Sequence, residues 1–402
     1  MIILVLNCGS SSLKYQVLDM RSNDDYELKA KGLVERIGEK VGSITHTVIG
    51  QDKFIVEKPV PDHSAGIRDV LSLLVSGDHG VLTSLDQIDA VGHRVAHGGE
   101  YFSGSVLITP QAEADIEKCC DLAPLHNPAN LLGIRAVKGL MPDIPQVAVF
   151  DTSFHQTMPD YAYMYSIPYK YYLKYKVRRY GFHGTSHKFV AGKAAKFADI
   201  DINNSRIITC HLGNGSSITA IKDGRSIDTS MGFTPVEGVT MGTRCGNLDA
   251  GAITYLQEKE GFDAAQISKV LNKESGLLGL SGISSDCRDI QTAASAGDDR
   301  ALLAQHVLAY GIKKYIGAYA AALNGVDMIV FTGGIGENSS STRANVCRGL
   351  EYLGVEFDEA VNEEIHGKDA YISKPSSKVK VVVTTTDEEL VIAQDTMAIV
   401  GK

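Results

Sequence analysis

Residues 2–12 of the chain read IILVLNCGSSS, and residues 207–217 read IITCHLGNGSS. Each stretch begins with residues that favour a β-strand and ends in a tight turn of glycine and serine, and an alternating second strand is expected after each turn. Glycine permits close approach of the backbone, and serine adds a short hydroxyl. Turns of this kind point backbone N–H groups at an anion, usually phosphate. The repeat therefore predicts two phosphate-binding hairpins in two related domains.

The composition narrows the class of protein. A chain of 402 residues with 44% hydrophobic residues is long enough for two or three domains. The net charge of −9 argues against a general nucleic-acid binder, although it leaves local nucleotide sites open. Seven cysteines without a CxxC pair predict reduced thiols in the cytoplasm and disfavour a zinc site. The first apolar stretch, 2–6, is too short for a signal peptide, and no run of about 18 apolar residues predicts a membrane span.

The rest of the chain alternates between predicted helices and predicted strands. Periodicity predicts helices over 65–75, 111–122, 130–140, 188–197 and 299–323, and strands over 87–91, 146–150, 328–332 and 379–384. A turn is expected at Asp223-Gly224 and a third glycine-rich turn at 333–338, directly after a strand. The sequence Thr386-Asp387-Glu388-Glu389 fits a capping box that opens a last helix. This order predicts two α/β domains of related architecture.

Several charged residues stand beside glycines, where anions are commonly bound. The signatures of a P-loop and of a Rossmann fold are absent. Lys14 follows the first serine turn and either contacts phosphate or lies exposed on its strand. Arg94 and Arg244 are candidates for binding an anion through two N–H groups of the guanidinium. The alternative is that both are exposed loop arginines. His93 and His97 have metal-binding spacing only in a helix, and the glycines that follow disfavour one.

Two further features leave alternatives open. Asp151 follows a buried strand, where it is either a catalytic carboxylate or a turn residue, and His183 either donates to a moving phosphoryl group or satisfies a loop carbonyl. Eight of the seventeen tyrosines lie within 161–180, among lysines and arginines. Such a cluster suits stacking on nucleic acid, but a domain or subunit contact is favoured.

Together these stretches resemble the acetate kinase family. The matching segments are 6–14, 92–99, 150–155, 181–187, 211–215 and 332–338, in the family's order and over nearly the whole chain. The resemblance implies an α/β, duplicated actin-like (ribonuclease H-like) two-domain fold with an active-site cleft between the domains. It implies one domain at 1–150 plus 384–402 and a nucleotide-binding domain at 151–383. The implied reaction is reversible phosphoryl transfer from ATP to acetate by a direct in-line step, which gives acetyl phosphate and ADP with Mg²⁺, or Mn²⁺ in its place.

The resemblance also implies roles for single residues. Asn7 and Glu388 correspond to the metal site, so the last strand and helix are expected to return to the first domain. Asp151, His183 and Arg244 correspond to catalytic residues. The acyl and carboxylate contacts correspond to Arg94, Ala96, Leu125, Phe182 and Pro235. The nucleotide contacts correspond to Ser10, Ser12, Lys14, His211, Leu212, Gly213, Asn214, Gly215, Asp286, Cys287, Arg288, Gly334, Ile335, Gly336, Glu337 and Asn338.

The chemistry of the implied reaction fits these residue types. A carboxylate nucleophile is already deprotonated at pH 7, so the task is to position two anions and neutralise charge. Asp151 is therefore expected to orient an arginine or metal-bound water and not to remove a proton. The resemblance further implies a cytoplasmic homodimer that binds neither nucleic acid nor membrane.

Two alternative functions remain. Valine is familiar in the family at the position of Ala96, so a roomier pocket and a propionate or butyrate kinase of the same family are one alternative. The other is a non-enzymatic ATP switch of the actin or Hsp70 class, which gives no role to the motifs at 93–99 and 181–187.

Overall fold

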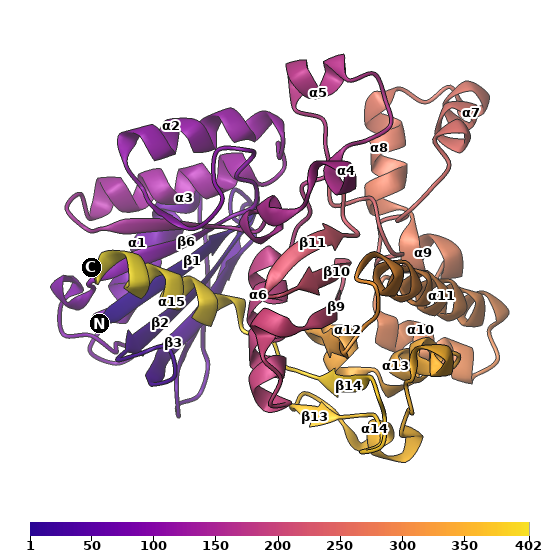
Figure 1. Ribbon diagram of the computed structural model, residues 1–402. Coiled ribbons are helices and arrows are strands. Elements are labelled where there is room, and N and C mark those ends of the chain that lie inside the picture. The colour runs from indigo at the N-terminus through magenta and orange to yellow at the C-terminus, as the bar shows by residue number, and fades with distance from the viewer. Residues whose placement is uncertain (402) are drawn as a thin grey trace. The chain divides into compact units, whose positions relative to one another are not determined.

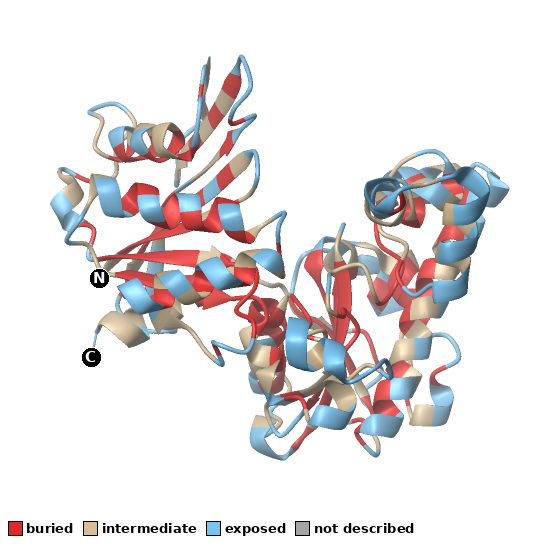
Figure 2. Cartoon of the chain, turned by 90° about the horizontal axis from the view of Figure 1, so that it is seen from above, coloured by how far each residue is buried: buried red, intermediate tan, exposed pale blue. Residues whose placement is uncertain are grey.

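The computed structural model describes residues 1–401 and divides them into two compact units. Unit 1 comprises Met1–Ser153 and Asp387–Lys402, and unit 2 comprises Phe154–Thr386. The sequence prediction placed the corresponding boundaries at 150 and 384. Each unit has its own sheet with helices on both faces, and Figure 2 shows buried strands beside helices that expose their outer surfaces.

Unit 1 is built on an eight-stranded sheet in the order β5-β4-β3-β2-β1-β6-β8-β7. Figure 1 labels its strands β1, β2, β3 and β6. The strands are β1 (Ile2–Cys8), β2 (Ser12–Met20), β3 (Tyr26–Glu35), β4 (Gly42–Val48), β5 (Phe54–Lys58), β6 (Ala90–Val95), β7 (Val106–Leu107) and β8 (Gln146–Phe150). The helices are α1 (His63–Leu74), α2 (Pro110–Lys118), α3 (Asn127–Leu140) and α15 (Glu388–Val400), with short 3-10 turns at Leu85–Gln87, Cys119–Asp121 and, at the unit boundary, Ser153–Thr157.

The continuous run of apolar residues in β1 explains why helices cover both faces of this sheet. Successive side chains of a strand point to opposite faces, and β1 is buried at Ile3, Leu4, Val5 and Leu6 in turn. Leu4 and Leu6 join the core formed with α1 and α3. The helix α15 contacts β1, β2, β6 and β8, and a Cβ at Gly92 would lie 2.6 Å from Ile392 Cγ2 of that helix. Glycine at 92 thus allows α15 to pack closely on β6.

Unit 2 is built on a six-stranded sheet in the order β11-β10-β9-β12-β14-β13. The strands are β9 (Arg206–Leu212), β10 (Ser216–Lys222), β11 (Arg225–Thr229), β12 (Met328–Thr332), β13 (Ala370–Tyr371) and β14 (Lys380–Val383). The helices are α4 (Asp160–Tyr163), α5 (Lys170–Tyr175), α6 (Gly184–Phe197), α7 (Ala250–Glu260), α8 (Ala264–Lys273), α9 (Gly276–Ser281), α10 (Cys287–Ser295), α11 (Asp299–Ala322), α12 (Gly333–Asn338), α13 (Ser340–Cys347) and α14 (Glu359–Glu364), with 3-10 turns at Ile202–Asn204 and Glu351–Leu353.

The two long helices of unit 2 cover opposite faces of its sheet. The helix α6 packs on Ile207 and Val330, whereas α11 packs on Ile208 and Ile329, the neighbours in sequence that point the other way. Buried positions of α11 recur at roughly helical spacing, as the sequence predicted for this segment. The turn at Asp223-Gly224 is confirmed, with φ of 50° and 75°, and joins β10 to β11.

The predicted internal repeat is confirmed by the topology. In unit 1, β1 pairs antiparallel with β2 and parallel with β6, which pairs parallel with β8. In unit 2, β9 pairs antiparallel with β10 and parallel with β12, which pairs parallel with β14. Each sheet therefore contains the same four-strand arrangement, and each glycine–serine turn closes the first hairpin.

Several sequence expectations were wrong in detail. Residues 333–338 form the helix α12 and not a turn, and strand β6 begins at Ala90 because residues 85–87 form a 3-10 turn. The last strand pairs with β12 in unit 2, so only the last helix belongs to unit 1. The cap of α15 is Asp387, whose side chain accepts from Leu390 N at 3.0 Å, so Thr386 does not open a capping box.

Candidate active site

Arg94 and Asp151 form a bidentate ion pair at the carboxyl ends of β6 and β8. The two strands are parallel neighbours with Val95 opposite Phe150, and Asp151 follows directly, its N–H bonded to the Val95 carbonyl at 3.1 Å. Arg94 Nε donates to Asp151 Oδ1 at 3.0 Å and Nη2 donates to Oδ2 at 2.5 Å. The Asp151 side chain is 2% exposed and that of Arg94 25% exposed. Asp151 raises the pKa of Arg94, so the guanidinium stays charged despite its burial.

Asn7 and Glu388 lie around the same arginine. Asn7 Oδ1, at the end of β1, accepts a hydrogen bond from Arg94 Nη1 at 3.3 Å. Burial, and next the charge of Asp151, raise the pKa of Glu388 to about 7, and the charge of Arg94 opposes this rise. Glu388 is the first residue of α15, so the return of this helix to unit 1 brings its carboxyl group into the cluster. The structure therefore brings together the two residues predicted for the metal, one predicted for the substrate and one predicted to be catalytic.

The donor set of this cluster suits a hard cation such as Mg²⁺. Asn7, Asp151 and Glu388 offer oxygen atoms, and Mg²⁺ is commonly held by one or two carboxylates together with water and phosphate oxygens. Burial and the charge of Asp151 raise the pKa of Glu388, so a cation bound beside these two groups would stabilise their charged forms. Within residues 1–401 no group of three His, Cys, Asp or Glu side chains could hold a metal by itself, so Asn7 or another oxygen ligand would have to complete a site at this cluster.

Lys14 has a carboxylate partner that the sequence did not suggest. Its Nζ forms an ion pair with Glu389 of α15, and the Lys14 side chain remains 51% exposed. The nearby serine turn is closed by a hydrogen bond from Gly9 N to Ser12 O at 2.8 Å, and Ser10 is exposed. Lys14, Ser10 and Ser12 therefore lie in unit 1, whereas the other residues predicted for the nucleotide lie in unit 2.

Histidine and hydroxyl groups lie at the corresponding edge of the second sheet. His183 precedes α6 in the left-handed region, with φ of 56°, and its ring stacks on that of His211 at 4.2 Å. Ser217 Oγ lies 2.9 Å from His183 Nδ1 and 2.7 Å from His187 Nε2. Burial keeps the pKa of His187 well below its ordinary value, so this ring is neutral. Ser186 Oγ holds His211 Nδ1 at 2.8 Å and so fixes the second ring of the stack.

Arg244 and His183 converge on the second glycine–serine turn. A Cβ at Gly215 would lie 3.3 Å from Arg244 Nη1 and 3.4 Å from His183 Nε2. Arg244 Nη1 also lies 3.4 Å from the carbonyl of Pro235 and 3.8 Å from the sulfur of Met241. Met241 packs with Phe182 in a small buried cluster. The structure thus brings the predicted residues Phe182, His183, Gly215, Pro235 and Arg244 into one region of unit 2.

A cavity of about 700 Å³ in unit 2 adjoins this region. It is lined by Gly213, Asn214, Ser285, Asp286, Cys287, Arg288, Gln291, Gly334, Ile335, Asn338 and Ser339. The predicted nucleotide residues supply most of this lining, and the volume falls within the range of small-molecule sites. The lining also includes three residues that the sequence did not predict, Ser285, Gln291 and Ser339. Each lies within three residues of a predicted position, so the segments were identified although these members were not.

Some predicted nucleotide residues lie beside the cavity without lining it. His211, Leu212, Gly215, Gly336 and Glu337 belong to this group. The carboxylate of Glu337 accepts from Gly333 N and Thr386 N, both at 3.0 Å, and from Thr332 Oγ1 at 3.2 Å. Its visible role is to hold α12 against the segment that leads to Glu388.

Arg288 is held at the cavity by Asp286. Arg288 Nη2 donates to Asp286 Oδ2 at 2.6 Å, while the guanidinium side chain remains 90% exposed. Hydrogen bonds from the side chain and backbone of Arg288 lower the pKa of Asp286 to about 2. A charged arginine in this position suits a phosphate-bearing ligand.

Ala96 and Leu125, the remaining acyl-pocket residues of the prediction, lie in unit 1. Ala96 follows β6 directly, is buried, and donates its N–H to Asn130 Oδ1 at 3.0 Å. Leu125, in the loop before α3, is 66% exposed.

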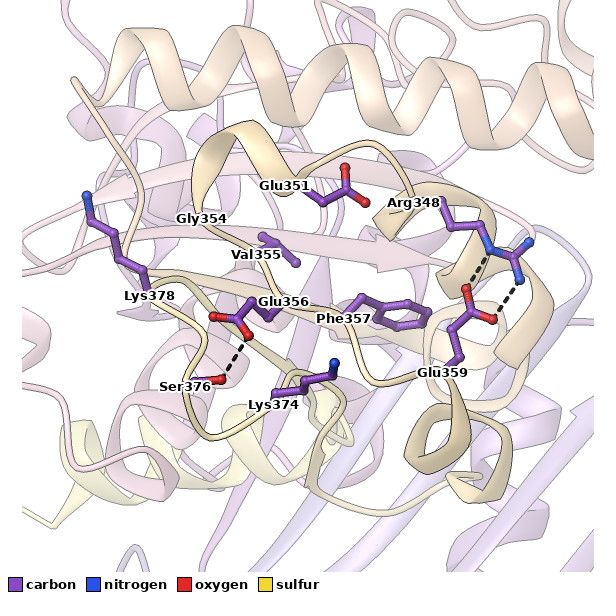
Figure 3. A pocket seen from close by; sticks show the side chains of 10 residues that line it. All are labelled: Arg348, Glu351, Gly354, Val355, Glu356, Phe357, Glu359, Lys374, Ser376 and Lys378. Carbon is purple, nitrogen blue, oxygen red and sulfur yellow. Dashed lines mark hydrogen bonds and ion pairs between the residues drawn. The ribbon is translucent and has the colours of Figure 1, made fainter.

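A second cavity in unit 2, of about 510 Å³, lies away from these residues (Figure 3). Its charged walls are partly neutralised internally, since Arg348 pairs with Glu359 at 2.8 Å and Ser376 Oγ donates to Glu356 at 2.8 Å. None of the predicted site residues lines it, so it is not the candidate site.

Comparison with known proteins identifies the family. The model of the Acetokinase family matches residues 2–394. An acetate kinase of Phocaeicola vulgatus is 56% identical over 400 residues and one of Bacteroides thetaiotaomicron 55%, each covering all of both chains. The crystal structure of Porphyromonas gingivalis acetate kinase has a TM-score of 0.96 at 52% identity, and that of a propionate kinase from Francisella tularensis has 0.91 at 41%, with 99% of each chain covered in both cases. These matches confirm the predicted α/β, duplicated actin-like fold. The chain belongs to the acetokinase family.

Proposed function

We propose that this chain catalyses the reversible, Mg²⁺-dependent transfer of the γ-phosphoryl group of ATP to acetate, giving acetyl phosphate and ADP by a direct in-line step. The observation that carries the proposal is the Arg94–Asp151 pair. It presents a charged guanidinium held rigidly by a buried carboxylate, beside the raised-pKa carboxyl group of Glu388. This arrangement binds and orients an anion without providing a strong general base, as a carboxylate nucleophile requires.

The roles of single residues follow from their surroundings. Arg94 orients the acetate carboxylate, and Asp151 holds the guanidinium plane of Arg94. His183 and Arg244 neutralise the charge that spreads over the transferring phosphoryl group. The cavity formed by 213–214, 285–291 and 334–339 receives the nucleotide, with Arg288 near the phosphates. Asn7 and Glu388 would hold Mg²⁺, which neutralises phosphate charge when bound, and Mn²⁺ can replace it.

A hydroxamate assay tests this proposal. The full chain is incubated with ATP, Mg²⁺, acetate and hydroxylamine, and acetyl hydroxamate is measured together with ADP. The expected result is hydroxamate that depends on each of ATP, Mg²⁺ and acetate. Release of ADP without hydroxamate would overturn the proposal and favour the ATP switch.

A second candidate is preferential phosphorylation of propionate. It is supported by the 41% identity to the propionate kinase of Francisella tularensis and by the small side chain at Ala96. We infer that acetate remains the preferred acid and that propionate is used comparatively well. Relative kcat/KM across formate, acetate, propionate and butyrate separates the two candidates.

The cell compartment and assembly belong to the same proposal. All seven cysteines lie within residues 1–401 and form no disulfide, which supports a reducing cytoplasm. No helix of the described chain has both the length and the apolar character to cross a bilayer. Exposed tyrosines at 161, 169 and 175 support a homodimer, because tyrosine is enriched at subunit contacts. Light scattering on the purified chain measures its assembly.

A further inference from the structure

Two residues of the tyrosine-rich segment 161–180 turn toward a loop that carries site residues. Tyr165 Oη donates to Glu237 Oε2 at 2.5 Å, and Arg179 Nη2 donates to Glu237 Oε1 at 2.5 Å. Both oxygen atoms of one carboxylate are therefore bound by this segment. The sequence of this segment favours a domain or subunit contact, and it predicts no role for Tyr165 or Arg179.

Glu237 belongs to the irregular loop 230–249, which connects β11 to α7 and carries Pro235 and Arg244. Arg179 Nη1 donates to the carbonyls of Thr229 at 2.9 Å and Ser230 at 3.1 Å, where the chain leaves β11. The N–H of Phe233 donates to Tyr165 Oη at 2.8 Å. The loop has no helix or strand of its own, so these side chains fix its first half.

The same group also holds the segment that precedes His183. The carbonyl of Gly232 accepts from Tyr180 N at 3.1 Å and from Gly181 N at 3.2 Å. A Cβ at Gly232 would lie 1.9 Å from Glu237 Oε2 and 2.3 Å from Tyr165 Oη, so only glycine allows this approach. The loop that bears Arg244 and the chain that leads to His183 are therefore joined at one point.

The charges of the group are largely shielded from water. The Arg179 side chain is 16% exposed and that of Glu237 is 32% exposed. Burial alone would lower the pKa of Arg179, but the charge of Glu237 raises it, so the ion pair persists. Burial also raises the pKa of Tyr165, which remains a protonated donor. Removing one partner of such a pair leaves a poorly solvated charge, which disturbs whatever the pair holds.

We propose that Tyr165, Arg179 and Glu237 form a positioning clamp that sets the loop 230–249 and thereby places Arg244 and Pro235 relative to His183. The inference rests on the proposed function, in which Arg244 and His183 act on the transferring phosphoryl group. The three residues are positioning residues, since they act through the loop. They do not line the 700 Å³ cavity, so changing them removes none of the side chains that line it.

This separation predicts a split between kcat and the KM for ATP. Misplacing a charge-stabilising group by about 1 Å can cost on the order of 10²-fold in rate. Glu237→Gln should lower kcat by about 10- to 100-fold while the KM for ATP changes by less than about threefold. Tyr165→Phe removes one hydroxyl and should lower kcat by about three- to tenfold.

The test uses the full chain with a matched control. Asp327→Asn weakens a different arginine–carboxylate pair of unit 2, that with Arg206, whose Nη2 lies 2.6 Å from Asp327 Oδ1, away from the site residues. Thermal unfolding, steady-state kinetics and hydrogen–deuterium exchange of peptides from 230–249 are measured for all variants. The expected result is faster exchange in this loop and lower kcat for the two clamp variants, with both quantities near wild type for Asp327→Asn.

Each outcome decides the inference. Unchanged kcat in Glu237→Gln, with or without faster exchange in the loop, would overturn it, as would equal losses of kcat in Asp327→Asn. If Glu237→Gln does not fold, Tyr165→Phe is judged by the same criteria. If wild type forms no acetyl phosphate, the proposed function fails by itself. The exchange data then decide whether the clamp holds the loop: faster exchange in the clamp variants supports it, and unchanged exchange overturns it.

Discussion

The two units share one sheet order but place different chemistry at the same edge. In unit 1 the carboxyl ends of β6 and β8 carry Arg94 and Asp151, with Glu388 beside them. In unit 2 the end of β9 carries His211, stacked on His183, next to a cavity of about 700 Å³. A duplicated backbone fixes where side chains meet, whereas residue type decides what they do there. Unit 1 places an arginine beside two carboxyl groups, whereas unit 2 provides a cavity together with histidines and the arginines Arg244 and Arg288.

The largest expected effect comes from removing the arginine of each unit. Arg94→Ala and Arg244→Ala should each lower kcat/KM for acetate by ~10²-fold or more, because each removes a preorganised charge. Arg94→Ala should also destabilise unit 1 by about 3 kcal/mol, since Asp151 is left buried without its partner. Initial rates and thermal unfolding measure the two effects separately.

A matched control exists in the Arg206–Asp327 pair, whose side chains are 37% and 35% exposed. Arg206→Ala should cost less than about 1 kcal/mol and leave kcat/KM near wild type. Wild-type activity in either site variant would remove that arginine from the mechanism.

The next prediction concerns the pH dependence of unit 1. In the folded chain the carboxyl group of Glu388 keeps its proton up to about pH 7. In the unfolded chain the same group loses its proton near its ordinary pKa of 4.5. The folded state therefore binds the extra proton between these values, and stability falls as pH rises through this window. Glu388→Gln should raise the free energy of unfolding by up to about 3 kcal/mol at pH 8 and by little at pH 4.5, without metal.

Magnesium should favour wild type over Glu388→Gln, which is the opposite of the stability difference expected without metal. When Mg²⁺ is added at pH 8, the midpoint of unfolding should rise in wild type and not in Glu388→Gln, because the variant lacks a charged ligand. Denaturant titrations at both pH values, with and without Mg²⁺, provide the measurement. Equal stabilisation of both proteins by Mg²⁺ would place the metal elsewhere.

A smaller effect is expected from filling the cavity of unit 2. Gly334 lines the cavity, and a Cβ there would meet no atom within 4 Å. Gly334→Leu should therefore fold normally and raise the KM for ATP by about tenfold, with kcat less affected, because it removes binding that ground state and transition state share. An unchanged KM would show that nucleotide does not occupy this cavity.

The smallest effect concerns acyl selectivity. One methylene in an apolar pocket is worth about 1–3 kcal/mol in discrimination. Ala96→Val should depress kcat/KM for propionate more than for acetate by roughly tenfold. If the ratio of the two values does not move, then Ala96, which is buried and bonded through its N–H to Asn130, does not line the acyl pocket.

The sequence predicted most of the fold because its signals are local. The two hairpins, the buried strand 146–150 and the long helix near 299–322 follow from alternation and helical spacing. The helix α12 was missed because residues 333, 334 and 336 are glycines, which disfavour helix. Tertiary bonds hold it: Glu337 accepts from Gly333 N, and Arg343 Nη1 donates to Gly336 O at 3.0 Å.

The site was predicted as separate residues and not as pairs. Arg94 and Asp151 were each identified, but their bidentate contact depends on the register of β6 and β8, which no local pattern encodes. The partnership of Lys14 with Glu389 likewise depends on the return of the last helix across the whole chain. The clamp residues were missed for the same reason, since Tyr165 and Glu237 lie 72 positions apart.

The most direct test of the account is to follow phosphorus in both directions by ³¹P NMR. The full chain is mixed with acetyl phosphate, ADP and Mg²⁺ in one tube and with ATP, acetate and Mg²⁺ in another. The account predicts that ATP appears in the first tube and acetyl phosphate in the second. At equilibrium both tubes should show the same mass-action ratio of ATP and acetate to ADP and acetyl phosphate. Inorganic phosphate without ATP in the first tube, or inorganic phosphate and ADP without acetyl phosphate in the second, would contradict it.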